Sequence, residues 1–409
     1  MTEHLLHVPD ALARLRNRTQ PAQLGVEIVF IDQAQGRILA EDLVATLASP
    51  PFDAVAVDGW AFAHQGPEST QPLVVVPGRA AAGHPFEGAL RPGQAVRVLT
   101  GAPLPLGADT VAPDEACHLI DGRLHLPPTL AAFANRRRRA EDVAPGERLL
   151  PQGHLLRPQD LGLAVQLGHA TLPVFRRLRV ALASSGDELR EPGQALVSGA
   201  IYDSNRAILR PLLTRLGVAV TDLGILGDDA AEVARILLDV AQTHEAVVVS
   251  GGASASEADH VARTIAQHGE LDLWRLAMKP GRPLALGRLG NAEIVGLPGN
   301  PVAATVAFVR FARPLLLRLA GAGWLEPQAI RLPAASRIDK RPGRTEYLRG
   351  CLIETPTGLA VACEAKQGSA MLGALSLATG LIELPAAATR IVPGDPVAWL
   401  SFTELGLTA

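Results

Sequence analysis

Small residues directly after a buried apolar run indicate a loop that could bind a phosphate group. The segment SGGASASEAD at 250–259 contains the small residues Ser250, Gly251, Gly252 and Ser254. Their backbone N–H groups can approach a phosphate closely, and the N-terminus of a following helix adds positive partial charge. Glu257 and Asp259 add carboxylates, which repel an anion unless a cation lies between them. A bridging Mg²⁺ ion resolves this conflict, whereas an ordinary strand-to-helix turn is the simpler alternative for this loop alone.

Further loops of similar form follow other apolar runs. SSGDEL carries Glu188 after small residues, and GLPGNPV contains Pro298, Gly299 and Asn300. The segment MKPGRP adds Lys279 and Arg282, which can hold an oxyanion. Each loop alone is compatible with a turn or a solvated surface. Their placement after neighbouring strands favours a ligand site.

Two motifs in the first part of the chain are harder to interpret. PPFDAVAVDGWA carries Asp58, and TGAPLPLGADT begins at Thr100 and is rich in Gly and Pro. An arginine run at 136–139 precedes Asp142. Taken singly, these segments are typical of turns and of a solvated stretch.

The elements expected to position the loops alternate between strand and helix. Strands are expected at 178–184, 218–226 and 246–250. The intervening helices are expected to begin near Asp203 and Asp228 or Asp229, which suit helix N-termini. Further helices are expected at about 259–267 and from Pro301. This alternation predicts a parallel sheet with helices on both faces and a ligand beyond the carboxyl ends of its strands.

The expected fold class is multidomain α/β plus β. A three-layer α/β domain with a mainly parallel sheet is expected at 173–322, and a small β-domain at 323–409. A β-rich domain at 46–139 is inserted into a mixed α/β linker domain formed by 1–45 and 140–172. The length of 409 residues and the 48% of hydrophobic residues agree with several packed cores.

Composition argues against several classes of protein. A net charge of −3 and only 4% aromatic residues give no basis for a nucleic-acid surface. The three cysteines form no CxxC pair, which fits a reducing compartment. The N-terminus lacks a secretory apolar run, and the apolar stretch 302–319 contains three arginines. We therefore expect a cytoplasmic protein without a membrane span.

The motifs, taken in order, resemble those of the molybdopterin molybdenumtransferase family, the MoeA proteins and the E-domains of plant and animal homologues. The resemblance covers nearly the whole chain and includes RRRAEDVAPGE, IYDSNR and MKPGRPLALG beside the loops above. It implies a molybdopterin-binding α/β domain and a homodimer whose active cleft is shared between subunits. It also implies the reaction of adenylylated molybdopterin with molybdate, in the presence of Mg²⁺, to give molybdenum cofactor and AMP. The molybdopterin adenylyltransferase is a further candidate partner.

The resemblance also implies roles for individual residues. The partner side of the cleft would supply Asp58, Thr100 and Asp142. The α/β side would supply Glu188, Asp228 and Asp259, with Asp259 and Asp228 as the Mg²⁺ ligands. Lys279 and Arg282 would face molybdate or the pterin phosphate, and Arg344 and Ser369 match positions that contact molybdate.

Several departures from the family pattern leave an alternative open. Ser256 stands where the family usually has glycine, and arginines occupy positions 275 and 282 of the basic motif. A serine forced to a positive φ costs about 1 kcal/mol, and arginine changes the donor geometry. A divergent, non-catalytic molybdopterin-binding or scaffold protein is therefore the second hypothesis. The related adenylyltransferase ranks last, because it needs neither the β-rich stretch nor the terminal β-domain. The sequence does not distinguish molybdate from tungstate.

Overall fold

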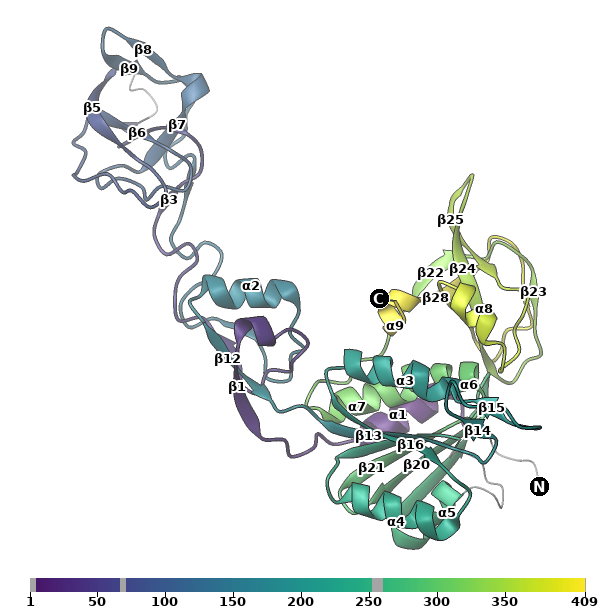
Figure 1. Cartoon of the computed structure of the whole chain (residues 1–409). Coiled ribbons are helices and arrows are strands. Elements are labelled where there is room, and N and C mark those ends of the chain that lie inside the picture. Colours follow the sequence, from purple (N-terminus) through teal and green to yellow (C-terminus); the bar gives the residue numbers. More distant parts are fainter. Residues whose placement is uncertain (1–4, 67–70, 252–259, 409) are drawn as a thin grey trace.

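The computed structural model describes residues 5–66, 71–251 and 260–408 and has an elongated shape (Figure 1). A two-domain body holds the central α/β domain and the C-terminal domain. A thin arm leads from this body through a small linker domain to a β-rich domain at the far end. The multidomain α/β plus β class expected from the sequence is confirmed.

The α/β domain is built on a six-stranded sheet in the order β16-β13-β17-β21-β20-β18. β16, β13, β17 and β21 run parallel, and β20 is antiparallel to both of its neighbours. The strands are β13 (Arg179–Ser185), β16 (Ala219–Leu226), β17 (Ala246–Ser250), β18 (Glu270–Arg275), β20 (Pro283–Leu289) and β21 (Ala292–Leu297). Residues of β13 alternate between two cores, which explains the continuous apolar run: Val180 and Leu182 face one, Ala181 and Ala183 the other.

Helices cover both faces of this sheet. On one face lie α1 (Val8–Arg18), α3 (Ser204–Arg215), α6 (Pro301–Ala307) and α7 (Arg313–Leu319). On the other face lie α4 (Ala230–Ala241) and α5 (His260–His268). Asp203 and Asp229 cap α3 and α4, since each side chain accepts hydrogen bonds from backbone N–H groups of the first turn.

The N-terminal helix α1 corrects one expectation about domains. The sequence grouped residues 1–45 with the linker domain, but Leu12 and Leu15 pack in the core of the α/β domain. Arg14 Nη2 also donates to both carboxylate oxygens of Asp272 on β18, at 3.0 and 2.9 Å. An apolar stripe specifies that a helix must be buried, not which core buries it.

The helix expected from Pro301 is interrupted by a π-helical turn, η3 (Phe308–Ala312), between α6 and α7. Pro314 lies just after this turn and has no N–H group to donate to the preceding turn. A π-turn accommodates such a missing hydrogen bond without ending the helix.

The arm comprises the linker domain and the β-rich domain, and its described residues form short paired strands around four small hydrophobic cores. In the linker domain, β1 (Val26–Phe30) pairs with β12 (Thr171–Phe175), β2 (Leu43–Val44) pairs with β11 (Arg148–Leu150), and η1 (Ile31–Gln33) and α2 (Pro158–Gln166) pack nearby. The β-rich domain has the strand order β7-β4-β6-β5-β9-β8. Its elements are β3 (Ala54–Val55), β4 (Gly59–Phe62), β5 (Leu73–Ala80), β6 (Gln94–Val98), β7 (Thr110–Pro113), η2 (Asp114–Ala116), β8 (His118–Ile120), β9 (Arg123–His125) and β10 (Arg136–Arg137).

The C-terminal domain is a β-sheet that takes in a strand from the α/β domain. Its order is β19-β24-β26-β28-β22, with β25 on β24. β19 (Met278–Lys279) belongs to the MKPGRP loop and pairs in parallel with the start of β24. The other elements of this domain are β22 (Ile330–Pro333), β23 (Ile338–Asp339), β24 (Thr345–Thr355), β25 (Gly358–Cys363), α8 (Leu372–Leu377), β26 (Gly380–Leu384), β27 (Arg390–Ile391), β28 (Pro396–Ser401) and α9 (Phe402–Leu405). Between β13 and α3 of the α/β domain, β14 (Leu189–Arg190) and β15 (Ile201–Tyr202) form a separate parallel pair. No helix in the described part of the chain is long and apolar enough to cross a membrane.

A charge cluster fixes the point where the linker domain enters the α/β domain. Glu245 Oε1 accepts hydrogen bonds from Arg176 at 2.6 Å and Arg179 at 2.7 Å. Burial alone would raise the pKa of Glu245, but the hydrogen bonds from the two arginines outweigh it and lower the pKa from 4.5 to about 2. The carboxylate therefore stabilises the folded state fully above pH 4.5, and this contribution is lost as the pH falls toward 2.

Replacing Glu245 with Gln should lower the melting temperature of the α/β domain at pH 7. We expect a loss of about 1–2 kcal/mol, or roughly 2–8 °C, because charge-assisted hydrogen bonds are lost. The difference between variant and wild type should shrink as the pH falls below 4.5. Differential scanning calorimetry over a pH series measures this, and a pH-independent difference would contradict the ion-pair explanation.

Candidate functional site

A hollow of about 190 Å³ lies where the carboxyl ends of β17 and β21 meet the C-terminal domain. It is lined by Gly251, Gly281, Arg282, Pro283, Pro298, Gly299, Asn300, Ala303 and Ser369. Six of these are residues that the sequence singled out, and they come from four separate motifs. The parallel register explains the meeting, since Ser250 lies beside Leu297 at the ends of two neighbouring strands.

The backbone approaches itself closely at this strand end. Gly251 has φ +97°, and a Cβ atom there would lie 2.4 Å from the carbonyl oxygen of Ser185. Its N–H donates to the carbonyl oxygen of Leu297 at 3.0 Å. Only glycine fits this position, so the first glycine of the SGG motif is needed to join the loop to the neighbouring strands. Gly252, Ser254, Ser256 and Asp259 lie outside the described residues.

Arg349 supports the opposite wall of the hollow, and sequence reasoning missed it. It is fully buried on β24, and its Nη2 donates to the carbonyl oxygens of Lys366 at 2.7 Å and Gly368 at 3.1 Å, just before Ser369. Within the described part of the chain, its Nε and Nη1 have no hydrogen-bond partner. Buried charge of this kind is costly unless a ligand or water uses it. The available signal was an arginine in the middle of the apolar run TEYLRGCL.

Cations gather beside the hollow where β19 joins β24. Lys279 is exposed, and its Nζ lies 3.5 Å from the buried carboxylate of Glu346. Burial lowers the pKa of Lys340, the carboxylate of Glu346 opposes this effect, and the charges of Arg344 and Lys279 lower the pKa further. The positive charges of Lys279 and Arg344, both predicted from the sequence as site residues, thus make the protonated form of Lys340 less favourable.

Carboxylates follow the ends of β13 and β16. Glu188 and Asp228 are both exposed, and the backbone N–H of Asp228 donates to Asp187 Oδ1 at 3.0 Å. Carboxylate oxygens are the ligands that Mg²⁺ prefers, so the chemistry of this group fits that ion. In residues 5–66, 71–251 and 260–408, however, no three His, Cys, Asp or Glu side chains converge as a metal site.

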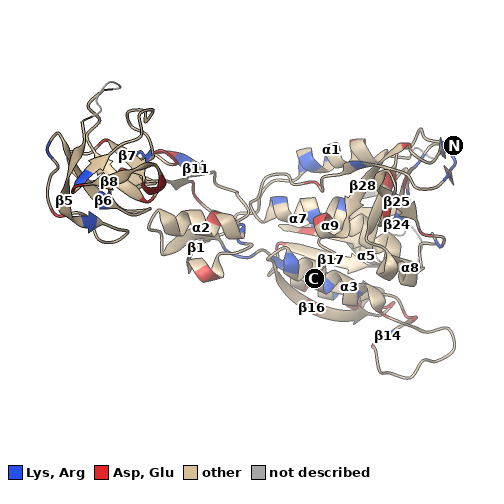
Figure 2. Cartoon of the chain, turned by 90° about the horizontal axis from the view of Figure 1, so that it is seen from above, with Lys and Arg blue, Asp and Glu red and all other residues tan. Residues whose placement is uncertain are grey.

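The remaining predicted residues lie on the arm. Asp58 Oδ1 accepts hydrogen bonds from the Thr100 hydroxyl at 2.6 Å and the Thr100 N–H at 2.7 Å. These two hydrogen bonds, the hydroxyl first, lower the pKa of Asp58 below its usual value. Asp142 accepts a hydrogen bond from Ser49 at 3.3 Å near the base of the β-rich domain. Figure 2, seen from above, places the β-rich domain and the body at opposite ends of the molecule. Within one chain, Asp58 and Thr100 therefore lie far from the hollow at the ends of β17 and β21, which we call the strand-end hollow.

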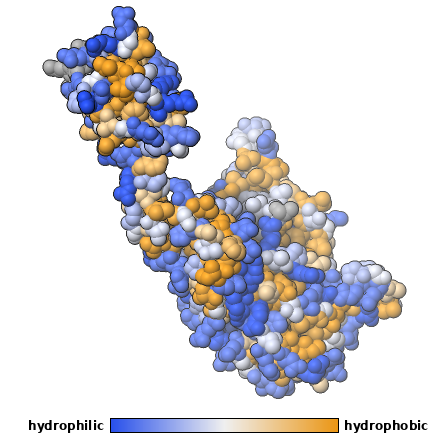
Figure 3. Space-filling view, turned by 60° about the vertical axis from the view of Figure 1, so that its left-hand side comes forward, coloured by the Kyte–Doolittle hydropathy of each residue, from blue (hydrophilic) through white to orange (hydrophobic). Residues whose placement is uncertain are grey.

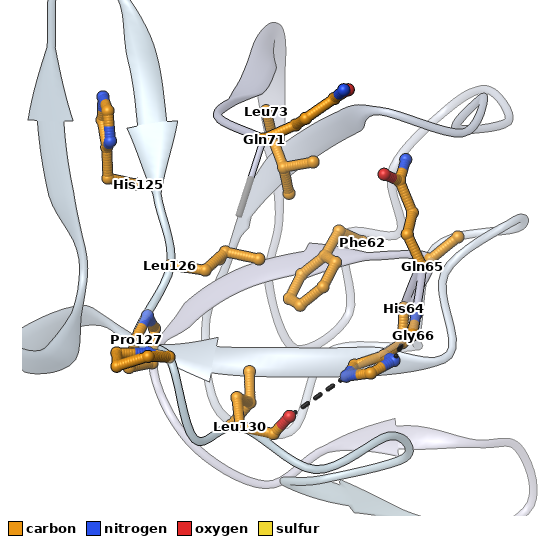
Figure 4. Close-up of a pocket in the computed structure, with 12 residues that line it drawn as sticks. Phe62, His64, Gln65, Gly66, Gln71, Leu73, His125, Leu126, Pro127 and Leu130 are labelled. Carbon is orange, nitrogen blue, oxygen red and sulfur yellow. Dashed lines mark hydrogen bonds between the residues drawn. The ribbon is translucent and has the colours of Figure 1, made fainter. Parts of the chain in front are cut away.

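A second hollow lies in the β-rich domain and contains none of the predicted residues (Figure 4). Its lining includes Phe62, Leu73, Leu126 and Leu130 around His64. His64 Nε2 contacts the carbonyl oxygen of Leu130 at 3.0 Å, and its Nδ1 accepts from the Gly66 N–H at 3.1 Å. Both ring nitrogens are therefore engaged in holding the loops together.

Known proteins match the chain along most of its length. Residues 6–168 match the model of the MoeA N-terminal region (domains I and II), 181–318 that of a probable molybdopterin binding domain, and 331–402 that of the MoeA C-terminal region (domain IV). The molybdopterin molybdenumtransferase of Haemophilus influenzae is 35% identical over 94% of this chain and 96% of its own. This chain belongs to the MoeA family. Molybdopterin molybdenumtransferase 2 of Mycobacterium tuberculosis is 34% identical over 90% of this chain and 92% of its own.

Solved structures of the family have the same arrangement. The molybdopterin biosynthesis MoeA protein of Pyrococcus horikoshii has a TM-score of 0.80 at 26% identity, and the match covers 97% of this chain and 100% of that one. The family resemblance inferred from the motifs is thus confirmed by sequence and by fold.

Replacing Thr100 with Val should raise the pKa of Asp58 toward its usual value. The substitution removes the hydroxyl donor that lowers this pKa most and leaves the backbone donor in place. An NMR titration of the Asp58 carboxyl carbon measures the shift. Thr129→Val, at an exposed position of the same domain, is the control. An unchanged Asp58 titration in the Thr100 variant would contradict the pairing.

Proposed function

We propose that this chain inserts molybdate into adenylylated molybdopterin and releases AMP. The observation that carries the proposal is the strand-end hollow, in which the glycine loops face Arg282 and Ser369. Backbone N–H groups and fixed cations are what a phosphate ester and a tetrahedral oxyanion require. The relatives from Haemophilus influenzae and Mycobacterium tuberculosis are named molybdopterin molybdenumtransferases, which supports the transfer of molybdenum to molybdopterin.

Each side of the hollow has a separate task in this proposal. The loops at Ser250–Gly251 and Pro298–Asn300 bind the phosphate groups of the substrate, and the same role is assigned to Gly252 and Ser254, which follow in the sequence. Lys279, Arg282, Arg344 and Ser369 hold molybdate. Arg349 fixes the segment before Ser369 and supplies positive charge, since its Nε and Nη1 have no described partner.

Mg²⁺ belongs to this proposal as the cation between substrate and carboxylates. Asp228 and Asp259 would hold it, and Glu188, which follows β13 as Asp228 follows β16, would act with them. When bound, Mg²⁺ neutralises charge on the bond between the pterin phosphate and AMP. The exposure of Glu188 and Asp228 leaves their carboxylates accessible to such an ion.

We further propose that two copies of the chain form a homodimer and share each cleft. Asp58, Thr100 and Asp142 would reach the strand-end hollow of the partner. The linker domain carries exposed apolar side chains (Figure 3), and Val26, Ile28 and Phe30 on one face of β1 are 54%, 66% and 64% exposed. Apolar side chains at alternate strand positions are normally covered. A second copy of this chain covers them in the proposal.

Wild-type protein should release AMP from adenylylated molybdopterin only when molybdate and Mg²⁺ are present. Asp228→Asn and Asp259→Ala should each reduce this release by roughly a hundredfold or more, as expected for a lost charge contact to the reacting phosphates. Chromatography of released AMP measures it. Substrate binding without any release by the wild type would instead favour the non-catalytic binding protein.

A mixture of two inactive variants tests the shared cleft. Asp58→Asn and Asp228→Asn subunits, unfolded together and refolded, should regain about a quarter of wild-type AMP release, because half of the dimers are mixed and contain one intact cleft. Each variant refolded alone is the control. No recovery in a mixture that contains mixed dimers would place both residues in one subunit's site.

Replacing Ile28 with Asp should separate the homodimer into monomers. A charge on the exposed face of β1 cannot be buried without a partner, so association becomes unfavourable. Sedimentation equilibrium measures the mass. Val165→Asp, at a 56% exposed position on α2, is a matched charge control in the same domain. A dimeric Ile28 variant would exclude this face from the interface.

We place the protein in the cytoplasm, which is supported by three described cysteines that are all free. A molybdopterin adenylyltransferase would be its upstream partner, because that class of enzyme supplies the adenylylated substrate.

A further inference from the structure

Asn205 occupies a buried position in the first turn of α3, above the strand ends. It follows Asp203 in the IYDSNR motif, and the Asp203 carboxylate accepts its backbone N–H at 3.1 Å. Only 9% of Asn205 is exposed. Ser184 and Ser250, which pair in the register of β13 and β17, are each 1% exposed. Both serines lie on the α3 face of the sheet, because Leu182 and Val248, two residues earlier, pack in the core on that face.

The amide of Asn205 joins two loops of the candidate site. Its Nδ2 donates to Ser250 Oγ at 2.6 Å and to the carbonyl oxygen of Gly299 at 2.7 Å. The orientation of the amide is unambiguous, because the Gly299 carbonyl can only accept a hydrogen bond. One side chain therefore connects the end of β17 to the loop after β21.

In the part of the chain that the structure describes, the oxygen of the same amide lacks a hydrogen-bond donor. Within the described residues, Asn205 Oδ1 and Ser184 Oγ are buried without a hydrogen-bond partner. A buried acceptor without a donor opposes folding. The stability of the fold thus gives little reason for an amide here, whereas the connection between the loops does.

We propose that Asn205 is a positioning residue that holds the Ser250–Gly251 and Pro298–Asn300 loops at a fixed separation for a phosphate-bearing substrate. This inference rests on the proposed function for the identity of that substrate. The connection itself is a property of the free protein. A loop held in place before binding loses less freedom when the ligand arrives.

Asn205→Leu removes the connection at nearly constant volume and also removes the unpartnered Oδ1. The melting temperature should change by no more than about 4 °C. KM for adenylylated molybdopterin should rise roughly 10- to 100-fold with kcat within about threefold, the pattern of lost binding shared by ground and transition states. Ser204→Ala, in the same helical turn, should leave both constants unchanged.

Asn205→Asp gives a readout that a merely structural role would not. The ionised carboxylate cannot donate to Gly299 and repels its carbonyl oxygen, whereas the protonated acid can donate. The ratio of the KM of this variant to that of wild type should therefore decrease as the pH falls from about 7 to 5, since burial favours the neutral form of the carboxyl group. A double variant with Ser250→Ala should have a smaller KM effect than the product of the single effects.

Hydrogen exchange separates this inference from the proposed function. In the free protein, the backbone amides of residues 302–304, which follow the Gly299 loop, should exchange at least fivefold faster in Asn205→Leu than in the Ser204→Ala control, because the loop is released. Unchanged exchange would overturn the inference even if the enzyme is active. Faster exchange with no AMP release by the wild type would keep the connection and reject only the proposed reaction. An unchanged KM in an active Asn205→Leu variant would also overturn the inference that Asn205 positions the two loops.

Discussion

The parallel hydrogen bonding of β13, β17 and β21 is the constraint on which the rest of the site depends. Parallel strands end on the same edge of a sheet, so loops that lie far apart in the sequence meet there. The register places Ser184, Ser250 and Leu297 side by side at that edge. The pairing of β19 with β24 then brings the C-terminal domain to the same edge. No comparable hollow could form from any one of these loops alone.

The sequence predicted the parts of the fold that local signals determine. A strand was expected at 178–184, and β13 spans Arg179–Ser185. A helix was expected to begin near Asp203, and α3 spans Ser204–Arg215. Continuous apolar runs and aspartate caps are strong local signals. The place of α1 and the β19–β24 pairing depend on contacts between distant segments, and nothing in either segment specifies its partner.

The candidate site likewise contains residues that local sequence signals reveal and residues that only contacts between distant segments reveal. Glycine loops and basic residues were identifiable because their types suit phosphate and oxyanion chemistry. Arg349 and Asn205 were missed because each acts through contacts that the sequence does not display. Arg349 is an arginine inside a strand, a place where a charged residue usually faces water, yet it is fully buried. Its neighbours in space, the carbonyls of Lys366 and Gly368, are 17 and 19 positions away.

The connection between the linker and β-rich domains has a mechanical consequence. Two stretches of chain cross it together, and they pair along its length: β2 with β11, Ser49 with Val143, and β3 with β10. A two-stranded ribbon bends more readily than it stretches, and it carries everything beyond it as one body. Asp58 and Thr100 both lie beyond this connection, so they keep their relative positions if the connection bends. In the homodimer that we propose, the Asp58–Thr100 pair would therefore reach the partner with its hydrogen-bonded geometry already set within its own domain.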